Sequence, residues 1–142
     1  MDENGRGALG EAKVQSDLIE SGFTVSIPVQ PAHYDLVAER NGELYRVQVK
    51  AAGFYQNRNT IKAQIMRSSR ATKKRKYSAD AFDILAVWGE PLDVIAYKAW
   101  EESVWSFSFC LDDEDIPSRA EHMVNRVGDQ TIEDAIERLK SV

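Results

Sequence analysis

The pattern of hydrophobic and polar positions predicts helices at both ends of the chain and strands between them. In residues 8–21, Ala8, Ala12, Leu18 and Ile19 fall on one arc at 100° per residue, which indicates a helix ending at Gly22. Residues 131–142 also have apolar positions at helical spacing, and Thr131 with Asp134 resembles a capping box. Strands are expected at "FTVSIPV", "TIKAQIM", "FDILAVW", "DVIAYKAW" and "VWSFSFCL". This order predicts an α/β (α+β) fold with a β-sheet flanked by helices.

Residues 34–52, "YDLVAERNGELYRVQVKAA", are predicted to form a β-hairpin. Asn41-Gly42 is a strong signal for a two-residue loop between two alternating runs. With that loop, the two residue numbers of every cross-strand pair add up to 83, starting from Arg40 opposite Glu43. The register then places six apolar side chains on one face of the hairpin, as the pairs Tyr34/Val49, Leu36/Val47 and Ala38/Tyr45.

The other face of this hairpin gathers polar residues that a plain hairpin does not need. Asp35 is expected opposite Gln48, and Lys50 follows two residues later on the same face. Glu11 falls inside the apolar arc of the first helix, where a carboxylate is costly without a partner. We therefore expect Glu11 to lie on the same side of the sheet as Asp35. The alternative is that Glu11 reaches the edge of the helix and is solvated.

Composition bounds the class of protein. The chain has 142 residues, of which 43% are hydrophobic and 29% charged, and this predicts one globular domain over residues 1–142. No apolar run approaches the length of a membrane span, and no signal peptide precedes the first helix. Cys110 is the single cysteine and is expected to be a small core or strand residue. An intracellular, reducing location, the cytoplasm, is expected.

The charge is unevenly distributed along the chain. The net charge is −5, but residues 1–100 hold 14 Lys/Arg against 12 Asp/Glu, a net of +2, while residues 101–142 hold 4 against 11, a net of −7. The acidic run Asp112–Asp115 is expected to be a solvated loop. A basic run contains six cations and no acid, and it is expected to contact nucleic-acid backbone, although a solvated loop is the alternative. Its cations are Arg67, Arg70, Lys73, Lys74, Arg75 and Lys76.

The polar residues suit the hydrolysis of a phosphodiester. That reaction needs charge neutralised around the phosphate and a water made nucleophilic, and Mg²⁺ supplies both through oxygen ligands. Glu11, Asp35, the Gln48 amide and the Val49 backbone carbonyl offer such oxygens. Lys50 is placed to orient or deprotonate the water, or to hold a phosphate oxygen.

The segments "GALGEAKVQSDLIESGF", "AHYDLVAE" and "YRVQVKAA" resemble the PD-(D/E)XK nuclease superfamily. Its core is a helix with an acidic residue, a strand with an Asp, and a second strand ending in (D/E)-x-K. Two positions depart from this signature: Tyr34 stands in place of Pro, and Gln48 in place of the acidic residue. Gln-x-Lys makes the chain look most like the group I intron-encoded homing endonucleases of this type.

The resemblance implies a restriction-endonuclease-like mixed sheet and a Mg²⁺-dependent DNA endonuclease, with Mn²⁺ as a substitute. It implies Glu11, Asp35, Gln48 and Lys50 as catalytic residues, and Glu11, Asp35 and the Val49 carbonyl as metal ligands. The expected partners are double-stranded DNA and further copies of the chain, as a dimer or tetramer, because cutting a duplex takes two sites. Two alternatives remain: a structure-specific nuclease similar to Holliday junction resolvases, and a catalytically silent DNA-binding module of the same fold.

Overall fold

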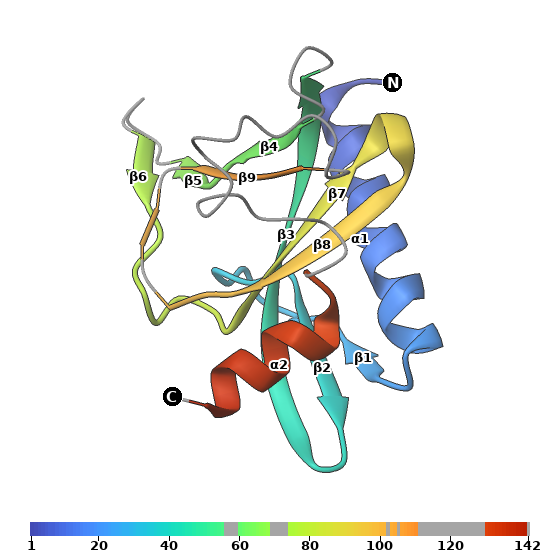
Figure 1. The fold of residues 1–142 in the computed structure, drawn as a ribbon, viewed down its shortest axis with the longest axis vertical. Helices are drawn as coiled ribbons and strands as arrows, with labels where there is room; N and C mark the ends of the chain where they lie inside the picture. The colour runs from blue at the N-terminus through green and yellow to red at the C-terminus, as the bar shows by residue number, and fades with distance from the viewer. Residues whose placement is uncertain (56–59, 69–73, 102, 105, 111–129, 142) are drawn as a thin grey trace.

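The structure, a computed structural model, describes residues 1–55, 60–68, 74–101, 103–104, 106–110 and 130–141. The chain order is helix, then strands, then helix (Figure 1). The elements are α1 Glu3–Glu20, β1 Thr24–Ser26, β2 Leu36–Arg40, β3 Glu43–Tyr55, β4 Thr60–Gln64, β5 Met66–Ser68, β6 Lys74–Lys76, β7 Ile84–Gly89, the 3₁₀ turn η2 Glu90–Leu92, β8 Val94–Ala99, β9 Ser106–Cys110 and α2 Ile132–Lys140. No helix in these ranges is both long and apolar enough to cross a membrane.

The long strand β3 organises a mixed sheet. In the described residues seven strands form this sheet, while β5 and β6 form a separate two-stranded ladder. β3 pairs antiparallel with β2 up to Val47, then parallel with β7 from Val47 to Ala52, and finally antiparallel with β4 from Gly53. β8 pairs with β7, and β9 pairs with β4. Beyond Val47, β3 therefore has no strand-to-strand ladder with β2, and the active-site candidates lie at this point. The α+β sheet with flanking helices is as expected.

The predicted hairpin is confirmed, but its ladder is shorter than expected. Asn41 and Gly42 both have positive φ, at 56° and 78°, as a tight two-residue loop requires. The ladder follows the predicted register from Arg40/Glu43 to Leu36/Val47. It ends at Leu36/Val47, so neither of the expected pairs Tyr34/Val49 and Asp35/Gln48 forms. The Tyr34 side chain packs against the cluster on the opposite side of the sheet from Val49. The expectation of six apolar side chains on one face was wrong for Tyr34, because the strand ends before it.

Helix α1 begins earlier than expected and buries a different stripe. Asp2 caps its N-terminus by accepting a hydrogen bond of 2.7 Å from the Gly5 N–H. The buried positions are Gly10, Val14 and Leu18, spaced by four residues. Ala8, Ala12 and Ile19, three members of the predicted arc, are exposed. The predicted arc was wrong for two reasons. It counted the small residues Ala8 and Ala12 as if they were large apolar side chains, and it left out Gly10, where the helix packs closely against the sheet.

Two buried clusters lie on either side of the sheet. The first contains the buried stripes of α1 and α2 with Leu36, Val47 and Val49. The second contains Ala52, Leu85 and Val87 with a group of aromatic rings. The predicted capping box of α2 is confirmed, since Asp134 N–H donates to Thr131 and Thr131 N–H to Asp134. In Figure 1, β5 and β6 lie at the opposite edge of the fold from α1.

Candidate active site

Asp35 lies at the place where the β2–β3 ladder ends. Its backbone N–H donates to the Val47 carbonyl at 2.9 Å, just before β2 begins at Leu36. Its carboxylate accepts a hydrogen bond of 2.9 Å from the Val49 N–H. The side chain thus satisfies a β3 amide that has no β2 strand partner, and this holds the carboxylate against the edge of β3.

Glu11 comes from α1 to the same place. Its carboxyl lies close enough to the Asp35 carboxyl for the two groups to influence each other's protonation. Burial raises the pKa of Glu11, and the charge and hydrogen bond of Asp35 raise it further. Glu11 and Asp35 also line one open groove of about 300 Å³, whose wall is the loop from Ile27 to Ala32. The expectation that Glu11 shares a side of the molecule with Asp35 is therefore met by the structure.

Helix α1 is fixed on the sheet by a close backbone approach and by polar contacts. A Cβ at Gly10 would lie 3.2 Å from Cε3 of Trp88, a tight contact that would require the ring or the helix to shift by a few tenths of an ångström. The Trp88 indole N–H donates to Asp93 at 2.8 Å, and the same carboxylate pairs with Lys13 at 3.1 Å. These contacts hold the turn of α1 that carries Glu11.

Two further polar contacts fix the ends of α1. Arg6 pairs with Glu90 in the η2 turn, near the start of the helix. Near its end, the Tyr97 hydroxyl donates to Asp17 at 2.6 Å. Together with the buried stripe, these contacts set the position along the sheet at which the Glu11 side chain leaves the helix.

Gln48 and Lys50 point to the other side of β3, because side chains alternate along a strand. Gln48 is the one polar residue in the buried class among the described residues, at 6% exposure, and its Nε2 lies 3.5 Å from the Val49 carbonyl. Burial lowers the pKa of the Lys50 ammonium, and the charge of Asp35 partly opposes this. Lys50 is thus partly desolvated and within the field of Asp35.

The donor set at this point fits a hard divalent cation. Two carboxylates lie side by side, and a cation between them would remove their repulsion. The Val49 carbonyl points to the same edge as the Val49 N–H, toward Asp35, because both groups of one strand residue face one edge. The described part of the chain holds no group of three or more His, Cys, Asp and Glu that could bind a metal ion. A metal here would therefore depend on the two acids with the carbonyl and the amide.

Comparison with known proteins agrees with this geometry. The sequence matches the PD-(D/E)XK endonuclease family over residues 1–129. The chain belongs to the PD-(D/E)XK endonuclease family. Its fold is similar to that of a solved bacterial homing endonuclease, with a TM-score of 0.71 and 17% sequence identity over 87% of this chain and 88% of the other. No protein of curated function matches the sequence.

The basic run of this family member is only partly described. Arg67 lies in β5, and Lys74 and Arg75 lie in β6, but only their backbones are described. Lys76 ends β6 and is exposed. Arg70 and Lys73 lie outside the described residues, as do the acidic run from Asp112 to Asp115 and the side chain of Cys110.

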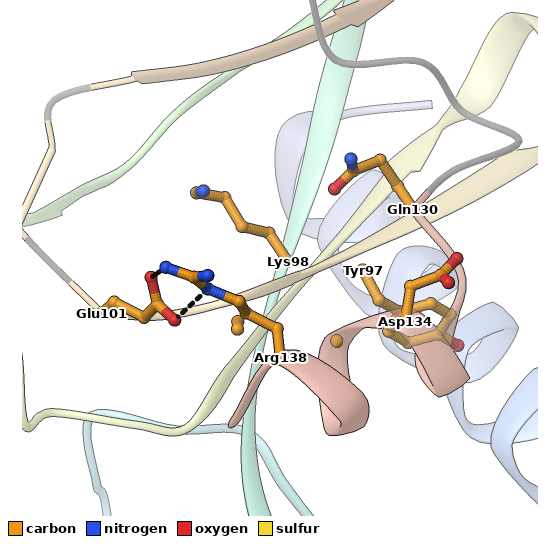
Figure 2. Close-up of a pocket in the computed structure, with 8 residues that line it drawn as sticks. Tyr97, Lys98, Glu101, Gln130, Asp134 and Arg138 are labelled. Atoms are coloured by element: carbon orange, nitrogen blue, oxygen red, sulfur yellow. Dashed lines mark hydrogen bonds and ion pairs between the residues drawn. The ribbon is translucent and has the colours of Figure 1, made fainter. Parts of the chain in front are cut away.

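A second hollow, of about 330 Å³, lies between β8 and α2, away from the acid pair (Figure 2). Its charged groups already have partners of their own, and Lys98 lies over the Phe107 ring. Arg138 forms a bidentate pair with Glu101, at 2.7 and 3.2 Å. Asp134 belongs to the capping box of α2. This hollow lacks a pair of adjacent carboxylates, and the groove beside Glu11 is the better candidate for the nuclease site.

Two residues that shape the site were not singled out from the sequence. Gly10 permits the close approach of α1, and a glycine in the middle of a predicted helix is a signal of such packing. Tyr77 lies beneath Lys50, with the ammonium 5.4 Å from the ring centroid. Its position directly after the basic run gave no local signal, because the contact joins residues far apart in sequence.

Proposed function

We propose that this PD-(D/E)XK protein is a metal-dependent DNA endonuclease that makes site-specific double-strand cuts of the homing type. The observation that carries the proposal is the meeting of Glu11 with Asp35 at the open edge of β3, with Lys50 one residue beyond Val49. The whole chain, residues 1–142, is proposed to form one nuclease domain.

Each residue of the proposed site has its own role in the reaction. Glu11, Asp35 and the Val49 carbonyl are proposed to hold Mg²⁺, or Mn²⁺ in its place, with the Gln48 amide oxygen as a weaker neutral donor. The metal, when bound, neutralises phosphate charge and makes water more acidic. Lys50 holds a nonbridging phosphate oxygen or orients the attacking water, and its charge acts mainly in the transition state.

The proposed substrate is double-stranded DNA, contacted along its backbone by the basic run. Cutting both strands requires two sites, so the active form is proposed to be a homo-oligomer, a dimer or tetramer. Replacing Lys73, Lys74 and Lys76 with Ala should lower DNA affinity and flatten the slope of log K against log salt by up to about 2.7, at about 0.9 for each phosphate contact. An unchanged slope would show that these lysines do not contact the DNA backbone.

Cleavage of supercoiled plasmid, followed over time with and without Mg²⁺, tests the function. Lys50→Ala is expected to lower the rate by about 10²- to 10⁴-fold while Ca²⁺-supported DNA binding stays near the wild-type value. Lys98→Ala is the matched control, because Lys98 also lies over an aromatic ring but on β8. If Lys50→Ala cuts as fast as the wild type, this hairpin is not the active site.

The same protein preparations also test the two alternative functions. A structure-specific nuclease similar to Holliday junction resolvases would prefer a four-way junction to a linear duplex. A silent DNA-binding module would bind DNA but would not cut plasmid with Mg²⁺ or Mn²⁺. The presence of Gln48 in place of an acid is the feature that keeps the silent module under consideration.

A further inference from the structure

The lysine of the proposed site rests on an aromatic ring from a distant part of the chain. The Lys50 ammonium lies 5.4 Å from the centroid of the Tyr77 ring. Tyr77 follows directly after β6, whereas Lys50 lies in the middle of β3. An ammonium over the face of an aromatic ring is attracted by the ring quadrupole, and more strongly when water is excluded. Tyr77 is 7% exposed, so the ring is well shielded from solvent.

The Tyr77 ring is itself held in place. It meets the Phe82 ring edge-on, with centroids 5.4 Å apart, and Phe82 in turn packs on Trp100 at 4.7 Å. The Trp100 indole N–H donates to the Ser78 carbonyl at 2.9 Å, which fixes the backbone next to Tyr77. The His33 ring, from the loop that leads to Asp35, also contacts Tyr77 in a T-shaped arrangement, with centroids 5.9 Å apart. The ring is thus a rigid support rather than a mobile cover.

We propose that Tyr77 is a positioning residue of the nuclease, whose ring holds the Lys50 ammonium in the place where it acts on the phosphate or the water. This inference rests on the proposed function. A lysine has a long side chain with many rotamers, and an ammonium beside two carboxylates would otherwise fold back onto them. Tyr77 belongs to the aromatic cluster on one side of the sheet, whereas the buried stripe of α1, the helix that carries Glu11, belongs to the cluster on the other side. Lys50 still interacts with the charge of Asp35 from its place over the ring.

The molecule contains a second contact of the same kind that serves as an internal control. The Lys98 ammonium lies 5.1 Å from the centroid of Phe107, which is 5% exposed. This pair joins β8 to β9, and neither residue lines the groove beside Glu11 and Asp35. Removing the Phe107 ring therefore repeats the chemical change without touching the proposed site.

The experiment compares Tyr77→Leu, Tyr77→Phe and Phe107→Leu in plasmid cleavage with Mg²⁺ and in DNA binding with Ca²⁺. Tyr77→Leu removes the ring and is expected to lower kcat by about 10- to 100-fold, because a misplaced group loses most of its effect on the transition state. KM and the Kd for DNA should change by less than about threefold. Tyr77→Phe keeps the ring and should restore kcat to within about twofold of the wild type. Phe107→Leu should leave kcat unchanged.

A direct measurement covers the case in which Tyr77→Leu does not fold. In the wild-type protein, the Lys50 Hε resonances, identified by their loss in Lys50→Arg, should be shifted upfield by the Tyr77 ring. Absence of that shift overturns the proposal without any variant of Tyr77. A folded Tyr77→Leu protein with wild-type kcat would also overturn the proposal, provided that Lys50→Ala is inactive. If instead Lys50→Ala is fully active, the nuclease mechanism itself has failed, and the two failures are thus distinguished.

Discussion

The proposed site has an acid half, Glu11 and Asp35, and a lysine half, Gln48 and Lys50 over Tyr77, and the two are supported in different ways. The acid half faces an open groove and is assembled from a helix and the residue just before β2. Within it, like charges meet. The lysine half belongs to one strand and lies against the aromatic side of the sheet, where Gln48 is buried and Lys50 is partly desolvated.

This difference indicates what each half needs in order to work. The acids are only partly buried, and burial and the charge of Asp35 both disfavour the ionised form of Glu11. A metal bound between them, as proposed, would therefore stabilise their arrangement. The lysine is already supported by the ring and the strand. We therefore expect changes in the acid half to appear in metal binding as well as in cleavage, and changes in the lysine half to appear in cleavage alone.

The largest expected effect is that of Asp35→Asn in the acid half. The amide keeps the size of the side chain but removes one of two charged ligands, so metal affinity and cleavage should both fall, the latter by about 10³-fold or more. Thermal unfolding with and without Ca²⁺ measures the metal effect, and plasmid nicking measures the rate. A variant that loses cleavage but keeps the full Ca²⁺ stabilisation would place Asp35 outside the metal site.

A smaller effect is expected from Gly10→Ala, which acts on the acid half through the position of α1. The added methyl meets Trp88 at 3.2 Å, and the indole cannot move freely because its N–H is bound to Asp93. A displacement of the helix should misplace Glu11 and lower cleavage by about tenfold. The rate is measured at saturating Mg²⁺, where a weaker metal affinity no longer limits cleavage. A rate that stays low there indicates that Glu11 is misplaced.

Gly7→Ala is the matched control on the same helix. A Cβ at Gly7 would meet nothing within 4 Å, so this change should leave cleavage unaltered. It should also stabilise the protein by about 0.5–1 kcal/mol, because alanine favours the helix over glycine. Equal rates for the two glycine variants would show that the close approach of α1 is not needed for the acid half.

The halves also differ in how far the sequence could predict them. The Asn41-Gly42 hairpin and its register follow from local turn chemistry and alternation, and these are enough to bring Asp35, Gln48 and Lys50 near one another. Glu11 was expected beside Asp35 because it fell inside the predicted apolar arc of α1; that arc was wrong, and Glu11 instead directly follows Gly10 of the buried stripe. Tyr77 could not be found in this way, because its contact with Lys50 arises from packing between distant segments. Tyr34 was misplaced for the same reason, since nothing local shows where β2 ends.

The next effect concerns Gln48, which belongs to the lysine half by its burial. Its amide oxygen is proposed as a ligand of the metal held by the acid half. Gln48→Ala should slow cleavage only several-fold, about tenfold at most, because a neutral amide holds a cation less strongly than a carboxylate does. Gln48→Glu restores the acidic residue of the family signature. It should lower the melting temperature without metal, since a buried third carboxylate is costly, and raise the stabilisation given by Ca²⁺. If neither variant alters the Ca²⁺ effect, Gln48 belongs to the lysine half alone.

The smallest expected effect is on stability, and it concerns the repulsion within the acid half. The pKa of Glu11 is raised in the folded protein, first by burial and then by Asp35. A carboxyl whose folded pKa is raised destabilises the fold as pH rises through that pKa and has no such effect below its unfolded value. Glu11→Gln should therefore raise the melting temperature of the metal-free protein by a few degrees, roughly 2–4 °C, at pH 8, and this difference should vanish near pH 4. The variant should also lose the stabilisation by Ca²⁺.

Glu39→Gln, at an exposed position on β2, is the control and should show neither change. A Glu11→Gln protein less stable than the wild type at pH 8 without metal would show that the two acids do not repel, and the division between the halves would then have no electrostatic basis.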